Sequence, residues 1–112
     1  MINTYIPDCG DLVWMDLDPT LRKKQQGRRP VVVMTPKAYN QFGLCITVPV
    51  TTKIKGYHTE VGLPASCEVE GVVLSNHPRS HEWMKRNIKF IECLDAKTVQ
   101  AIQLRLKALL GL

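Results

Sequence analysis

Short apolar segments separated by turn residues run through most of this chain, and they predict a small β-rich protein. A run of apolar and aromatic residues at 12–17 stops at Asp18-Pro19, which is typical of a strand. Pro30 opens a second run at 31–34, whose β-branched residues indicate a strand buried on both faces. By the same criteria, further strands are expected at residues 44–50, 60–63, 69–75 and 88–94. Within the third of these, Gly71 marks a bulge or a close approach of two backbones.

The last part of the chain has the periodicity of an amphipathic helix. Asp95 is a good N-cap, and Gly111 fits a C-terminal stop. Between them, one helical face collects Val99, Ile102, Leu106, Leu109 and Leu110. Residues 37–42 suit one helical turn, and residues 76–83 suit a polar loop or a short helix. The expected fold for residues 1–112 is therefore a single domain, mainly β with a C-terminal helix, built as a small, strongly curved sheet or barrel.

Positive charge is concentrated in a few segments, although the net charge of the 112-residue chain is +5. Residues 1–21 carry four Asp and no Lys or Arg, whereas residues 22–29 carry five Lys or Arg and no carboxylate. Such closely spaced positive charges repel one another, which favours a polyanionic partner. A solvated basic loop is the simpler alternative, but Pro30 and the valine run fix one end of this loop rigidly, as in a binding site.

Composition disfavours several classes of protein. The first residues lack a basic signal-peptide region, and no apolar run approaches the ~20 residues of a membrane helix. A cytoplasmic location without a membrane partner is therefore expected. The four cysteines lack the C-x-x-C spacing of zinc and redox sites, so we expect free thiols that fill small apolar spaces. We therefore expect that the chain uses no cofactor and that its cysteines do not bind a metal. These cysteines are Cys9, Cys45, Cys67 and Cys93.

Six motifs follow one another along the chain. They are Pro7-Asp8-x-Gly10-Asp11-Leu12-Val13-Trp14, Asp18-Pro19-Thr20, Gln25-x-Gly27-x-Arg29-Pro30, Val48-Pro49-Val50-Thr51-Thr52, Lys55-Gly56-Tyr57 and Gly71-Val72-Val73-Leu74. Together they resemble the MazF/PemK/Kid toxins, most closely the MazF branch. The resemblance implies an SH3-like barrel of the CcdB/MazF type and a toxin of a type II toxin–antitoxin system. It also implies a homodimeric, metal-independent endoribonuclease that cleaves single-stranded RNA, including mRNA, inhibits translation and growth, and is neutralised by a small MazE-like antitoxin.

Two residues match the catalytic pair of that family, namely Arg29 and Thr51. RNA cleavage without a metal uses the neighbouring 2′-hydroxyl as nucleophile, and it leaves a 2′,3′-cyclic phosphate and a 5′-hydroxyl. The reaction needs proton transfer and positive charge at the phosphate. The planar guanidinium of Arg29 suits two phosphate oxygens, so we expect it to stabilise the transition state. The Thr51 hydroxyl is expected to hydrogen-bond the scissile phosphate.

Proton transfer near neutral pH points to histidine, and His77 is the candidate because it directly follows a predicted strand. A lone histidine is more often structural, and the spacing of His77 and His81 also suits two metal ligands on a helix, although a third ligand is lacking. Trp14 is expected in the core, whereas Trp83 suits the core and the surface equally. The residues expected to bind RNA by charge, hydrogen bonding or stacking are Lys24, Gln25, Gln26, Arg28, Lys53, Lys55, Tyr57, Asn76 and Arg79.

The chain departs from many MazF relatives at three positions. Lys24 stands where they carry a glutamate, Asn76 where they often carry an aspartate, and Arg28 where some carry a histidine. The loop is thereby more basic, which favours RNA binding, but two candidate proton acceptors are lost. We expect the cleavage rate or the cut site to differ, with activity retained through Arg29 and Thr51.

Two other functions stay open at this point. A toxin that binds gyrase, as CcdB does, would depend on the end of the helix, but residues 108–112 contain no aromatic side chain. A non-catalytic RNA-binding barrel would keep the basic loop without the chemistry. For the nuclease, both subunits of the homodimer are expected to line the RNA groove, and an acidic, partly disordered antitoxin segment is expected to fill it.

Overall fold

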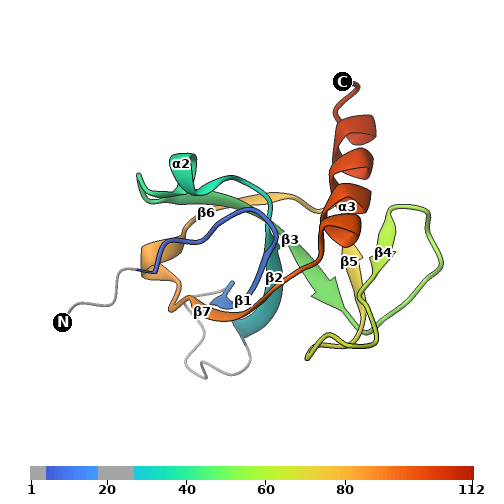
Figure 1. Cartoon of the computed structure of the whole chain (residues 1–112), viewed down its shortest axis with the longest axis horizontal. Helices are drawn as coiled ribbons and strands as arrows, with labels where there is room; N and C mark the ends of the chain where they lie inside the picture. Colours follow the sequence, from blue (N-terminus) through green and yellow to red (C-terminus); the bar gives the residue numbers. More distant parts are fainter. Residues whose placement is uncertain (1–4, 18–26) are drawn as a thin grey trace.

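A computed structural model describes residues 5–17 and 27–112, in which a strongly curved β-sheet carries a long helix at its side (Figure 1). The elements are β1 (Asp11–Asp16), β2 (Arg28–Val33), α2 (Lys37–Asn40), β3 (Leu44–Thr51), β4 (Glu60–Gly62), β5 (Val72–Leu74), β6 (Arg79–Glu82), the 3₁₀ turn η1 (Trp83–Lys85), β7 (Lys89–Cys93) and α3 (Ala96–Leu109). The strands are ordered β4-β5-β3-β2-β1-β7, and β6 pairs with β3 beside this path. The predicted fold class, mainly β with a C-terminal helix, is confirmed.

Both faces of the central strands β1 and β2 are buried. Val31, Val32 and Val33 are at most 1% exposed, as their β-branched run predicted. Because side chains alternate along a strand, these residues divide between two cores. The first core, which includes α3, contains Leu12, Val32, Val48, Val50, Val61, Val73, Leu94 and Ile102. The second contains Val13, Met15, Val31, Val33, Cys45 and Trp83.

Strand β3 is the hub of the sheet. Its first half pairs with β6, its middle with β2, and its last two residues with β5. All three pairings are antiparallel. The end of β3, at Thr51, is therefore held by backbone hydrogen bonds to a neighbouring strand rather than left in a free loop.

The structure corrects the prediction of a polar loop or short helix at 76–83. Residues from Arg79 onwards form β6, because the first half of β3 needs a hydrogen-bonding partner there and tertiary pairing overrides the polar composition. The side chain of His81 on this strand is buried. Trp83 follows in η1, is also buried, and donates its indole N–H to the Asn40 carbonyl at 2.8 Å.

Strand β2 begins at Arg28, two residues earlier than expected, so both Arg28 and Arg29 are strand residues. Strand β5 is shorter than expected and starts after Gly71, whose φ is +133°. A Cβ atom on Gly71 would lie 2.4 Å from the Thr51 carbonyl oxygen. The predicted close approach of two backbones is confirmed, and it occurs directly beside Thr51.

Helix α3 begins as predicted, at Asp95. The Asp95 carboxylate accepts hydrogen bonds from the Thr98 N–H at 3.1 Å and from the Thr98 hydroxyl, and these bonds lower the pKa of Asp95. The predicted apolar face is buried at Ile102, but Leu109 and Leu110 are 49% and 66% exposed. The last turns extend beyond the sheet, which leaves nothing for them to pack on within the described residues (Figure 1). Neither α3 nor the other described helix is long and apolar enough to cross a membrane.

Candidate active site

Arg29 and Thr51 line the same surface hollow. Their strands β2 and β3 pair as far as Val31 opposite Pro49, and each residue lies two positions beyond this last pair. The hollow has a volume of about 430 Å³. Its lining comes from β1, β2, the end of β3 and the turn before β5, and consists of Trp14, Arg29, Pro30, Val50, Thr51, Thr52, Lys53, Val69 and Glu70.

A second hollow, of about 220 Å³, adjoins the first and shares Thr51 and Lys53 with it. Six of the residues predicted to act on RNA meet here, because the segment after β3 and the segment after β5 line the same hollow. The complete lining is Thr51, Lys53, Lys55, Tyr57, Glu60, Leu74, Asn76 and His77. We call the two hollows together the Thr51 groove.

The Thr51 groove has a basic, solvent-exposed surface. Arg29, Lys53 and Lys55 are all exposed. In the part of the chain that the structure describes, the single ion pair joins Lys85 and Glu82. None of the three groove cations therefore forms an ion pair with a described carboxylate. Unpaired cations around one concave surface attract an anionic ligand.

Thr51 is fixed in position by local contacts. Its Oγ1 accepts a hydrogen bond from the Lys53 N–H at 3.1 Å, which leaves the hydroxyl hydrogen available to a ligand. The backbone of Gly71 approaches the Thr51 carbonyl closely. The hydroxyl is thus presented by a held strand end.

Two arginines next to each other in β2 have different surroundings. The Arg28 guanidinium lies over the Trp14 ring, 4.9 Å from its centroid. Within the described residues, the Arg29 guanidinium makes one hydrogen bond, from Nη1 to the Arg28 carbonyl at 3.0 Å. Arg29 is therefore the arginine that is available to a ligand in the groove.

The structure separates the histidines that the sequence placed together. His77 is exposed in the groove, whereas His81 is buried on β6. No helix connects them, so the possible pair of metal ligands on a helix face is ruled out. Among the described residues, no group of three or more His, Cys, Asp or Glu side chains is arranged to hold a metal ion.

Some predicted residues do not line the groove. Arg79 is exposed at the start of β6, opposite Thr47, and belongs to neither hollow. Lys24, Gln25 and Gln26 lie outside the described residues. Their predicted contacts with RNA stay predictions.

Three groove residues were missed by sequence reasoning. Trp14 was expected in the core, but it is only partly buried, because it faces the first hollow beside Pro30 and Arg29. Glu60 and Glu70 also line the groove. They bring two carboxylates into it, although the sequence comparison had suggested the loss of two at Lys24 and Asn76. The position of Glu60 just after a basic loop was the available signal, whereas nothing in the sequence set Glu70 apart.

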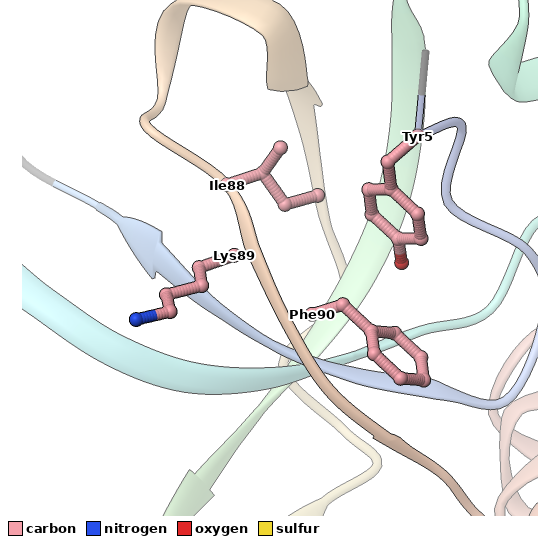
Figure 2. Close-up of a pocket in the computed structure, with 4 residues that line it drawn as sticks. All are labelled: Tyr5, Ile88, Lys89 and Phe90. Carbon is pink, nitrogen blue, oxygen red and sulfur yellow. The ribbon is translucent and has the colours of Figure 1, made fainter. Parts of the chain in front are cut away.

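A third hollow, of about 440 Å³, lies elsewhere and is lined by Tyr5, Ile88, Lys89 and Phe90 (Figure 2). The Tyr5 and Phe90 rings are tilted against each other with centroids 5.6 Å apart. The Tyr5 hydroxyl donates to Asp11 Oδ2 at 2.7 Å, and burial together with this bond raises the pKa of Tyr5. The Lys89 ammonium points away from both rings (Figure 2). This surface is mainly apolar and offers no nucleophile or proton-transfer pair.

Comparison with known proteins identifies the family. The model of PemK-like, MazF-like toxins of type II toxin–antitoxin systems matches residues 8–110. The endoribonuclease toxin MazF of Escherichia coli (strain K12) is 39% identical over 112 residues, which cover 99% of this chain and 100% of that protein.

Solved structures agree with this assignment. MazF from Deinococcus radiodurans (Form-I) superimposes with a TM-score of 0.88 at 42% identity, covering 97% of this chain and 100% of that one. The MazE–MazF structure (Form-II) from the same organism gives a TM-score of 0.86 at 40% identity, covering 97% and 99%. The chain therefore belongs to the PemK-like, MazF-like toxins of type II toxin–antitoxin systems, and its enzyme class is endoribonuclease.

Proposed function

We propose that this chain cleaves single-stranded RNA in the Thr51 groove without a metal ion, and that cleavage of mRNA inhibits translation and growth. The observation that supports the proposal is the presence of Arg29 and Thr51, from two different strands, in one basic hollow. A relative that is 39% identical is named an endoribonuclease toxin, so we do not carry the gyrase-binding and non-catalytic alternatives further.

The bonds that change belong to the RNA itself. The 2′-oxygen attacks the adjacent phosphorus while the bond from phosphorus to the 5′-oxygen breaks. One proton leaves the 2′-oxygen, and one proton is delivered to the departing 5′-oxygen. The products are a 2′,3′-cyclic phosphate and a 5′-hydroxyl.

Arg29 and Thr51 act on the phosphate in this scheme. The Arg29 guanidinium stays charged and directs two N–H groups at the non-bridging oxygens, where negative charge increases as the phosphorus becomes five-coordinate. The Thr51 hydroxyl adds a third donor, because its oxygen already accepts from the Lys53 N–H. Both groups stabilise the transition state more than the substrate, as catalysis requires.

The second hollow holds the nucleotides beside the scissile bond. His77 is placed there and is our candidate for proton transfer. Lys53 and Lys55 neutralise neighbouring phosphates, Tyr57 stacks on a base, and Asn76 hydrogen-bonds a base edge.

The toxin acts as a homodimer and is blocked by an antitoxin. Large apolar side chains are exposed on this single chain, including Phe42, Met84, Leu104, Leu110 and Leu112, and a second copy would cover part of them. The solved MazE–MazF structure from Deinococcus radiodurans supports an antitoxin partner, and an acidic segment suits the basic Thr51 groove. Sedimentation at micromolar concentration measures the dimer, and competition between RNA and an acidic antitoxin peptide measures the overlap of their sites.

Cleavage of a long RNA by the purified protein in EDTA tests the main proposal. We expect discrete cuts with 5′-hydroxyl ends, which also define the cleavage motif. Arg29→Ala should slow cleavage by roughly 10²–10³-fold, as expected for the loss of a group that stabilises transition-state charge. Arg29→Lys keeps the charge but loses the planar fork, so it should restore only a small part of the rate.

Lys97→Ala is the matched control, because Lys97 is exposed on the first turn of α3 and lines neither hollow. It should cleave as the unmodified protein does. Full cleavage by Arg29→Ala, or complete inhibition by EDTA, would contradict the proposal.

A further inference from the structure

We propose that Glu60 and Arg105 are positioning residues, which hold the loop at 53–58 in the shape that receives RNA. The proposal rests on the function proposed above, since it assigns the loop to RNA binding. It concerns residues that do not act on the phosphate themselves. Glu60 follows the loop in β4, and Arg105 comes from α3, so the loop is held at two places by side chains of regular elements.

Glu60 holds the middle of the loop through both oxygens of its carboxylate. The Lys55 N–H donates to Oε2 at 3.0 Å, and the Gly56 N–H donates to Oε1 at 3.0 Å. The Glu60 N–H in turn donates to the Tyr57 carbonyl at 3.0 Å, which closes the turn. Gly56 has a φ of +83°, a conformation that favours glycine. Two successive N–H groups that converge on one anion form a backbone nest, and here the anion is the protein's own carboxylate.

This arrangement gives Glu60 a structural role in the loop. Although Glu60 lines the second hollow beside His77, each of its carboxylate oxygens already accepts a charge-assisted hydrogen bond from the backbone. One bond to each oxygen fixes the orientation of the carboxylate relative to the loop. The contacts therefore assign Glu60 to the shape of the loop.

Arg105 holds the far end of the loop against α3. Its Nε donates to the His58 carbonyl at 2.6 Å, and its Nη1 donates to the Ala101 carbonyl one turn earlier in the helix at 2.9 Å. The helix itself is anchored close by through Ile102, which is fully buried. Arg105 thus connects the loop to an element whose position is set by the core.

The side chains that this loop presents depend on these contacts. Lys53, Lys55 and Tyr57 are exposed, and no other hydrogen bond between the described residues holds the stretch from Ile54 to His58 against another element. If the loop were free, RNA binding would have to order it, and the lost conformational freedom would weaken binding. The expected signature is a raised KM with little change in kcat.

Two pairs of variants test the proposal on the full chain. Glu60→Ala removes the acceptor, and Glu68→Ala is its control, because Glu68 is exposed and lines neither hollow. Arg105→Met keeps the apolar stem but removes the donors, and Lys107→Met is its control on the same helix. With an RNA oligonucleotide that contains the mapped cut site, Glu60→Ala and Arg105→Met should each raise KM roughly tenfold and change kcat by less than about threefold. The two controls should leave both constants unchanged.

Amide hydrogen exchange provides a readout that does not depend on activity. In Glu60→Ala, exchange at the Lys55 and Gly56 amides should accelerate roughly tenfold, while the Val48 amide in β3 should keep its protection. Unchanged exchange at Lys55 and Gly56 would overturn the proposal, as would a fall in kcat at constant KM. If the unmodified protein cuts no RNA, the proposed function fails, but the exchange rates still decide whether Glu60 holds the loop.

Discussion

At the scale of single residues, His81 has the most unusual surroundings. Its side chain is 3% exposed, and neither ring nitrogen has a hydrogen-bond partner among the described residues. Burial, with the nearby charges of Arg86 and Arg79, lowers the pKa of His81 from 6.5 to about 4. The ring is therefore neutral in the folded protein at pH 7, and protonation of the folded state is disfavoured.

This environment predicts that the protein loses stability in mild acid. As the pH falls below 6.5, the unfolded state binds a proton at His81 before the folded state does, and the difference grows until about pH 4. The resulting loss in the free energy of unfolding reaches up to about 3 kcal/mol. Urea unfolding at pH 7 and pH 4.5 measures it.

His81→Leu removes the titrating ring and keeps an apolar side chain of similar size. Between pH 7 and pH 4.5, the free energy of unfolding should fall less for this variant than for the unmodified protein. Titration of the carboxylates contributes equally to the two proteins, so the difference reports on His81. It should not be destabilised at pH 7, since no hydrogen bond among the described residues is lost. An identical pH dependence in both proteins would show that another group is responsible.

The sequence predicted that Arg29 and Thr51 lie together, but it predicted their surroundings less well. Arg29 and Thr51 stand in motifs that place each at a strand end, and pairing of β2 with β3 brings them together. Trp14 has the same apolar neighbours as a core residue, so only the three-dimensional arrangement reveals that it faces the groove. The role of Glu60 depends on the turn formed at 55–60, which no spacing rule specifies.

At the scale of elements, α3 has one packed part and one free part. Ile102 is fully buried in the first core, whereas Leu110 at the helix end is mostly exposed. Ile102→Ala should lower the free energy of unfolding by about 2–5 kcal/mol, because it leaves a cavity. Leu110→Ala should change it by less than about 0.5 kcal/mol.

Chemical denaturation of both variants, at concentrations low enough for a monomer, checks this difference. Equal losses would mean that the helix end packs as tightly as its first turns.

Helix α3 also shows what periodicity can predict and what it cannot. The 3.6-residue pattern identified α3 and its apolar face. It could not show how much of that face is buried, because this depends on where the sheet ends.

Strand β6 could not be predicted from its own sequence. All four residues at 79–82 are polar or charged, so their sequence does not resemble a strand. They become one because Leu44–Thr47 of β3 has an open edge there. The apolar strands β1, β2 and β3 were predictable because their own side chains form the core, whereas β6 is specified by its partner.

At the scale of the whole molecule, Asn40 joins three distant segments. Its Nδ2 donates to the carbonyls of Pro7 and Thr35 at 2.8 Å and 2.7 Å, and its Oδ1 accepts from the Thr35 hydroxyl at 2.6 Å. Its own carbonyl accepts from the Trp83 indole. The N-terminal segment, the β2–β3 connection and η1 thus meet at one fully buried amide.

Asn40→Ala should lower the free energy of unfolding by about 3 kcal/mol or more, because each buried polar group that loses its partner costs about 1–3 kcal/mol. Gln41→Ala is the control next to it, since the Gln41 side chain is exposed and donates to an exposed carbonyl. Its effect should stay below about 0.5 kcal/mol. Thermal unfolding of the two variants side by side measures the difference, and equal melting temperatures would refute this role of Asn40.

The Thr51 groove takes its lining from positions as far apart as Trp14 and His77, and β1, which carries Trp14, is bordered by β7 near the end of the chain. The groove can therefore be complete only after all of these lining residues have been synthesised, and its β1 wall only after β7 has been added.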